Sequence, residues 1–143
     1  MTNSTRRRWP RQALRVLGGT VAATGLLLGG TSLPASAAGN PYTPRKVCGS
    51  GYGVQRAHAL PGATVYQLFN GRTNCVVTIK TAAVGRPTKI TAGLRVAGSS
   101  WAYDTGRYAY YAGPVKQAGA GKCVRYFGYS GGRNYTGPWG NCG

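Results

Sequence analysis

The stretch Lys89-Ile90-Thr91-Ala92-Gly93-Leu94-Arg95-Val96 shows the clearest two-residue alternation in this chain. Apolar side chains fall on every second residue, and mostly polar or charged ones lie between them. This period of two is typical of a β-strand that buries one face and exposes the other to water. The stretch therefore predicts a half-buried strand, and it decides the fold class in favour of β structure.

Further strands are predicted on both sides of this stretch, with turn signals between them. Pro61-Gly62 suits the two central positions of a type II turn, Asn70-Gly71 is a hairpin signal, and Asp104-Thr105-Gly106 also predicts a turn. The expected strands are residues 53–59, 64–69, 74–80, 89–96, 100–103, 107–111 and 123–127. Their number and even spacing predict an all-β domain, a small antiparallel β-sandwich or barrel, with no helix after residue 38.

The four cysteines, Cys48, Cys75, Cys123 and Cys142, all lie in the second part of the chain. An even number of cysteines in a small exported domain predicts disulfides, here two. Zinc sites need close cysteine or histidine pairs, which this spacing lacks, so no metal is predicted. The pairing Cys48–Cys75 with Cys123–Cys142 is favoured because each bond closes a short loop, but two other pairings stay open.

The first 38 residues have the pattern of a cleavable export signal. Basic residues from Arg6 to Arg15 precede a weakly apolar run, which ends at Ala35-Ser36-Ala37-Ala38. Small residues allow cleavage before Ala38 or before Gly39, and the adjacent arginines also suit a twin-arginine route. The predicted organisation is a signal peptide at 1–38, an extended arm at 39–46 and a disulfide-stapled β domain at 47–143. No transmembrane segment is predicted in the mature chain.

Positive charge dominates what remains after the signal. Residues 39–143 hold 13 Lys and Arg residues but a single acidic residue, Asp104. Such a surface attracts polyanions, and the expected partners are wall polymers, with nucleic acid or anionic lipid as less specific ones. The oligomeric state is left open by the sequence.

The shortage of acid and imidazole groups argues against an enzyme. General acid–base catalysis uses carboxylates or histidines, and residues 39–143 offer only Asp104 and His58. A pair of carboxylates for glycoside hydrolysis is excluded, and no nucleophile elbow or phosphate-binding loop occurs. Asp104 is expected to bond the backbone of its own turn. We therefore predict a non-enzymatic protein with no catalytic residues and no cofactor.

Rings and cations alternate in the last third of the chain. They could form a stacking surface for single-stranded nucleic acid or sugar, although tyrosines are also ordinary strand residues. The candidate surface consists of Arg107, Tyr108, Tyr110, Tyr111, Arg125 and Tyr126.

Several short stretches together resemble the secreted spore-associated protein A family of filamentous actinomycetes. They include residues 40–44, 47–52, 58–60, 63–66, 74–78, 104–106, 110–115, 122–124 and 141–143. All four cysteines lie in these stretches, and the resemblance covers essentially the whole mature chain. It implies a small exported protein located at the spore or cell surface. The positive charge of the mature chain is what would hold it on anionic cell-wall or spore-surface polymers. The resemblance implies no catalytic residues and no defined ligand.

Overall fold

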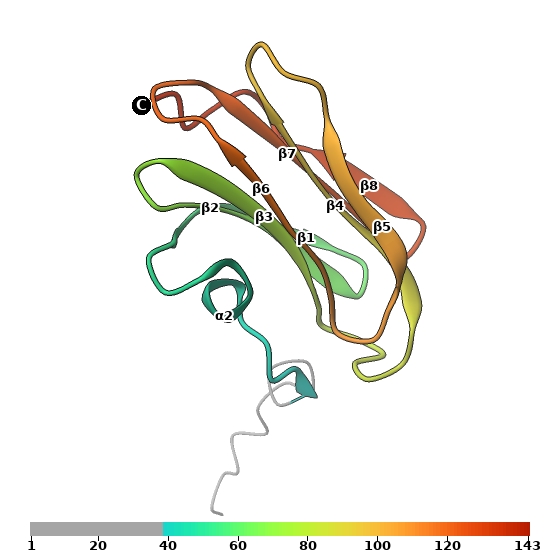
Figure 1. Cartoon of the computed structure of the whole chain (residues 1–143). Helices are drawn as coiled ribbons and strands as arrows, with labels where there is room; N and C mark the ends of the chain where they lie inside the picture. The colour runs from blue at the N-terminus through green and yellow to red at the C-terminus, as the bar shows by residue number, and fades with distance from the viewer. Residues whose placement is uncertain (1–38) are drawn as a thin grey trace, which may run out of the picture. The chain divides into compact units, whose positions relative to one another are not determined.

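The computed structural model describes residues 39–143, and the predicted signal peptide at 1–38 lies outside the described residues. One short helix and eight strands make up this part of the chain (Figure 1). They are α2 (Pro44–Cys48), β1 (Gly53–Leu60), β2 (Ala63–Phe69), β3 (Thr73–Lys80), β4 (Thr88–Val96), β5 (Ala102–Tyr108), β6 (Tyr111–Ala118), β7 (Val124–Ser130) and β8 (Arg133–Thr136).

The strands form two four-stranded antiparallel sheets that face each other. The first sheet has the order β1-β2-β3-β6, and the second has the order β5-β4-β7-β8. The main core lies between them and contains the predicted apolar set of β4, Ile90, Ala92, Leu94 and Val96, together with Val65 and others. The expected all-β fold is confirmed, and of the two alternatives it is the sandwich.

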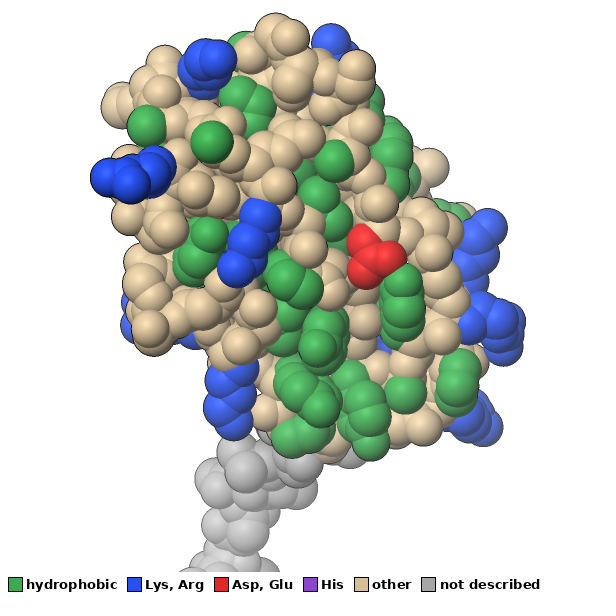
Figure 2. Space-filling view, viewed as in Figure 1, with side chains coloured by type: hydrophobic (Ala, Val, Ile, Leu, Met, Phe, Trp, Pro, Cys, Tyr) green, Lys and Arg blue, Asp and Glu red, His purple; other side chains and the backbone are tan. Residues whose placement is uncertain are grey.

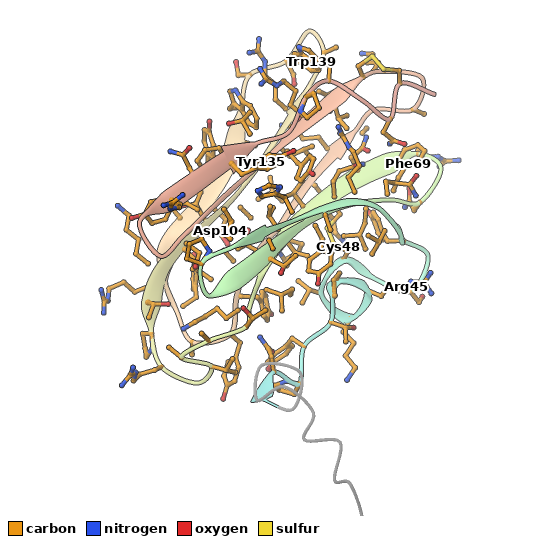
Figure 3. The ribbon with its side chains drawn as sticks, turned by 180° about the vertical axis from the view of Figure 1, so that it is seen from behind. Arg45, Cys48, Phe69, Asp104, Tyr135 and Trp139 are labelled. Carbon is orange, nitrogen blue, oxygen red and sulfur yellow. A yellow bond between two sulfur atoms is a disulfide. The ribbon has the colours of Figure 1, made fainter. Side chains whose placement is uncertain are left out.

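A second apolar cluster covers the other face of the first sheet. Helix α2 packs there, on the side that points away from the second sheet (Figures 1 and 3). The buried disulfide Cys48–Cys75 fastens the helix to β3. Because β3 is covered on both faces, nearly all of its residues are buried, as in a strand at the centre of a layered domain.

The prediction of an extended arm at 39–46 was wrong in its last residues, because the chain turns into α2 at Pro44. The Thr43 side chain accepts a hydrogen bond from the backbone N–H of Lys46 at 3.3 Å, and Pro44 occupies the first turn. A threonine N-cap followed by proline is a common helix start. The apolar pattern was too short to predict a five-residue helix.

The prediction of a turn at Asp104-Thr105-Gly106 was also wrong, because β5 runs straight through these residues. Their side chains are alternately half-buried and exposed, and Gly106 pairs with Ile90 of β4. The turn lies instead between Tyr108 and Tyr111, so the segment expected to be one strand is shared by β5 and β6. Strand β8 follows the last strand that the sequence predicted, at residues 123–127, and was not expected.

The second disulfide joins Cys123 to Cys142, so the favoured pairing is confirmed. It holds the C-terminal segment against the start of β7, where Val124 and Gly140 also exchange backbone hydrogen bonds of 2.8 and 3.0 Å. Within residues 39–143, no helix is long and apolar enough to cross a membrane.

Candidate binding surface

The outer face of the second sheet carries an unusual set of side chains. On β4, β5 and β7 every second residue points away from the core, and these positions are occupied mainly by cations, aromatic rings and threonines. We call this face the outer platform. It comprises Lys89, Thr91, Gly93, Arg95, Trp101, Tyr103, Thr105, Arg107, Arg125, Phe127 and Tyr129, with Trp139 at one end.

Tyr103 lies at the centre of the outer platform, and its ring rests on the backbone of Gly93. A Cβ atom at Gly93 would come within 2.6 Å of the Tyr103 ring, so only glycine leaves room for it there. Trp101 stacks beside Tyr103, with ring centroids 5.4 Å apart and 14° between planes. Phe127 meets Tyr103 edge-on at 5.5 Å and 87°. Three neighbours therefore fix the orientation of a side chain that is 53% exposed.

A shallow hollow of about 310 Å³ lies beside this ring. It is lined by Lys89, Thr91, Tyr103, Thr105, Phe127 and Tyr129. The hydroxyl oxygens of Thr91 and Thr105 are 3.0 Å apart and share one hydrogen bond. The hollow therefore combines an aromatic wall, paired hydroxyl groups and one ammonium group.

Two pairs of like charges lie on the same face. Lys89 is the cross-strand partner of Arg107, and Arg95 is the cross-strand partner of Arg125. The guanidinium carbons of Arg95 and Arg125 each lie 5.7 Å from the ring centroid of Trp139. Cations directly opposite one another repel and destabilise a sheet. The chain has only one acidic side chain, so carboxylates cannot offset this repulsion across the platform.

The structure separates the six residues that the sequence suggested as one surface. Arg107 and Arg125 belong to the outer platform, but Tyr108, Tyr110 and Tyr111 lie around the β5–β6 turn. There they line a separate hollow of about 360 Å³ together with Tyr42. Tyr126 is only 3% exposed and packs in the main core, so its inclusion in a surface was wrong. Burial raises the pKa of Tyr126 to about 12.

The residues that the sequence reading missed are Lys89, Trp101, Tyr103 and Trp139. A signal for two of them was present, because residues 101, 103, 105 and 107 alternate in the way that β4 does. The turn expected at residues 104–106 hid this alternation. Without that turn, Tyr103 and Arg107 fall on one face of a single strand.

Asp104, the only acidic side chain, bridges the two sheets at their β5–β6 edge. One carboxylate oxygen accepts a hydrogen bond from the backbone N–H of Gly113 on β6 at 2.7 Å, and the other accepts from the Tyr108 hydroxyl. The hydrogen bond to Asp104, with partial burial, raises the pKa of Tyr108. Figure 2 shows this side of the domain, where a single acidic side chain lies among apolar ones.

His58 lies at the opposite edge of the sandwich, on β1. Its ring stacks on Tyr135 of β8, with centroids 3.5 Å apart and 4° between planes. Figure 3 shows Tyr135 between the two sheets at this edge. His58 on β1 and Asp104 on β5, beside β6, therefore lie at opposite edges of the sandwich and are not brought together. In residues 39–143, no three His, Cys, Asp or Glu side chains are grouped to hold a metal ion.

Two cations, the half-buried Arg56 and the buried Lys80, have structural roles. The Arg56 guanidinium donates to Oε1 of Gln67 at 3.1 Å and to the carbonyls of Val124 and Pro138 at 2.9 and 2.7 Å, so it ties the two sheets together. The Lys80 ammonium, 1% exposed, donates to backbone carbonyls of the β3–β4 loop. Burial lowers the pKa of both side chains, and nearby Arg86 adds to the effect at Lys80.

Fold and surface define a class: small, strongly basic β-sandwich domains stapled by two disulfides, with aromatic and cationic side chains gathered on one sheet. No family model and no solved structure matches the chain. The chain is 34% identical over 139 residues to spore-associated protein A of Streptomyces coelicolor, which covers 91% of this chain and 90% of that protein. The chain therefore belongs to the spore-associated protein A family, as its sequence resemblance predicted.

Proposed function

We propose that this protein is a non-enzymatic, secreted component of the spore or cell surface, held on anionic wall polymers by its basic surface. The observation that carries the proposal is the relationship to a protein named for its association with spores. Charge supplies the means of attachment, since residues 39–143 hold 13 basic side chains and one acidic one. Summed positive charge attracts polyanions over distances that single contacts cannot reach.

Secretion is supported by the export-signal pattern at 1–38 and by the two disulfides. Both bonds connect cysteines that follow this pattern, and the domain that they staple has no free cysteine. Disulfides persist in oxidising surroundings outside the cytoplasm. Two disulfides would stabilise a small domain outside the cell, where cytoplasmic chaperones do not act on it.

A binding role, rather than catalysis, is supported by the positions of the two groups that could act as acid and base. Asp104 has both oxygens engaged at the β5–β6 edge, and His58 is stacked at the β1–β8 edge. Acid–base catalysis needs such groups within hydrogen-bond reach of the same substrate. Adhesion needs only an accessible charged surface.

A salt wash of intact spores and vegetative cells tests the proposal. The Debye length falls from about 10 Å at 0.1 M salt to about 3 Å at 1 M, so charge-held protein should stay bound at low salt and elute as salt rises. Replacing Lys116, Lys122 and Arg133 by Gln should shift elution to lower salt. A matched control replaces exposed, uncharged Gln55, Asn134 and Thr136 by Ala and should elute like the wild type. Protein that is found wholly in the medium at low salt would contradict the proposal.

A second candidate is an extracellular binding module for nucleic acid, glycan or a protein partner, including an antimicrobial or inhibitor-like role. It is favoured by the exposure of Tyr103 and Trp139, 53% and 44%, among cations on one face. A module of this kind should select among polyanions of equal charge. Equal affinity for all of them, with the same dependence on salt, would leave only general charge attraction.

A further inference from the structure

We propose that the outer platform is a binding site for an anionic glycan, a polymer of sugar units that carry phosphate or carboxylate groups. A sugar ring would stack on Tyr103, and the negative groups would lie against the cation pairs at the two ends. This inference rests on the proposed surface function, and it specifies both the site and the chemical class of the polymer.

The first support is the prepared ring of Tyr103. Its underside rests on Gly93, Trp101 stacks beside it with ring centroids 5.4 Å apart, and Phe127 meets it edge-on at 5.5 Å. Its side chain remains 53% exposed, the highest value among the exposed large apolar side chains of residues 39–143. A side chain that is already ordered loses little conformational entropy when a ligand binds. The geometry therefore offers a flat, rigid face to a sugar ring.

The second support is the arrangement of charge. Lys89 and Arg107 oppose each other at one end of β4, and Arg95 and Arg125 oppose each other at the other end. Arg95 lies six positions after Lys89, a span of about 20 Å along a strand. Each like-charged pair destabilises the free sheet, and an anion between its members would remove the repulsion. Two such pairs on one line fit a polymer with repeated negative groups.

The third support distinguishes a glycan from single-stranded nucleic acid. Nucleic acid needs several successive open ring faces on which its bases stack. On the outer platform, Trp139 already has two guanidinium groups over its ring at 5.7 Å, and Phe127 directs its edge at Tyr103. Beside Tyr103, the platform ring with the largest exposed fraction, lie the hydroxyls of Thr91 and Thr105 in a hollow of about 310 Å³. Hydroxyl groups that both donate and accept suit the hydroxyls of a sugar.

The test uses the mature chain and three probes matched in charge: polygalacturonate, polyphosphate and an oligo(dT) strand. Binding is measured by calorimetry at 0.15 M salt. We expect polygalacturonate to bind about tenfold more tightly than polyphosphate, since one stacked ring contributes an affinity factor of this order. Tyr103→Ala should lose that preference and Tyr103→Phe should keep it. Tyr110→Ala, which removes an exposed tyrosine outside the platform, is the matched control and should bind like the wild type.

Charge placement is tested with two double variants that remove the same charge. Lys89→Gln with Arg107→Gln changes the platform, and Lys116→Gln with Arg133→Gln changes exposed cations elsewhere. The platform pair should lower affinity for polygalacturonate several-fold more than the control pair. Tyr103→Thr, which suits a strand, serves as a second ring variant, and circular dichroism confirms that each variant is folded.

Three results would overturn the inference: Tyr103→Ala binding like the wild type, oligo(dT) binding as tightly as polygalacturonate, or equal losses in the two double variants. The salt wash of spores tests the proposed surface attachment separately from the glycan site. There, wild-type protein in the medium at low salt contradicts surface attachment itself. If the spores retain the wild-type and Tyr103→Ala proteins equally, surface attachment still holds and only the glycan site on the outer platform is contradicted.

Discussion

The two disulfides differ in burial, and this difference predicts unequal losses of stability when each is removed. The cysteines of the two bonds are 27 and 19 residues apart. Loop-closure entropy alone assigns them nearly equal contributions, about 3.5 and 3.2 kcal/mol. However, Cys48 and Cys75 are 2% and 0% exposed and belong to the apolar cluster beneath α2, whereas Cys142 is exposed.

Replacing Cys48 and Cys75 together by Ala should therefore cost more than replacing Cys123 and Cys142. Each buried sulfur leaves a cavity of about methylene size, at about 1 kcal/mol per site. The expected losses in free energy of unfolding are about 5–6 kcal/mol for the first pair and about 3 kcal/mol for the second. Urea denaturation at pH 7 measures both values against the wild type.

Trypsin provides a second measurement of the same effect. Arg45 and Lys46 are exposed on α2, which the buried disulfide fastens to β3. Without that bond, the helix should detach and cleavage after these residues should become faster, while removal of Cys123–Cys142 should leave it unchanged. Equal losses of stability in the two variants, within about 0.5 kcal/mol, would refute the reasoning. Loop-closure entropy would then account for the contribution of both disulfides, and burial of the sulfurs would add nothing.

Three further predictions concern the core and the sheets. Arg56→Lys should lower the free energy of unfolding by about 2 kcal/mol in urea, because one ammonium group cannot serve three acceptors in the guanidinium geometry. Gly93→Val should lower it by about 1–3 kcal/mol in the same assay, because the new Cβ displaces the Tyr103 ring. Stability should fall between pH 10 and 12, since a raised pKa at Tyr126 favours the protonated folded state below that window. Tyr126→Phe should reduce this fall, as followed by urea midpoints across the pH range.

Much of the fold follows from local patterns. The alternation from Lys89 to Val96 correctly predicted a strand and its buried face, and Asn70-Gly71 marked a real turn. There the Asn70 side chain accepts hydrogen bonds from the backbone N–H groups of Arg72 and Thr73 at 3.0 and 2.7 Å. Short cysteine loops gave the correct pairing. These features depend on neighbours in sequence, so a single sequence contains enough information to predict them.

The outer platform, by contrast, depends on pairing between strands. Asp104-Thr105-Gly106 has the composition of a turn, yet β4 pairs with this segment along its whole length. Tertiary pairing thus overrode the local preference, and the error concealed the face that Tyr103 and Arg107 share. The burial of Tyr126 and Tyr129 could not be predicted from the sequence for the same reason. Only the register of β7 decides which tyrosine is buried and which lies on the outer face.

The position of Asp104 bears on why the chain has so few acids. Its carboxylate accepts hydrogen bonds from two groups, one on β6 and one on β5, at an edge where the two sheets must be joined. An ionised acceptor makes stronger hydrogen bonds than a neutral one, so this position gains from a negative charge. The 13 basic side chains of residues 39–143 have no second acid among them. One carboxylate is thus kept where the fold uses it, and the proposed function needs the rest of the surface to remain positive, since that charge would attract a polyanion.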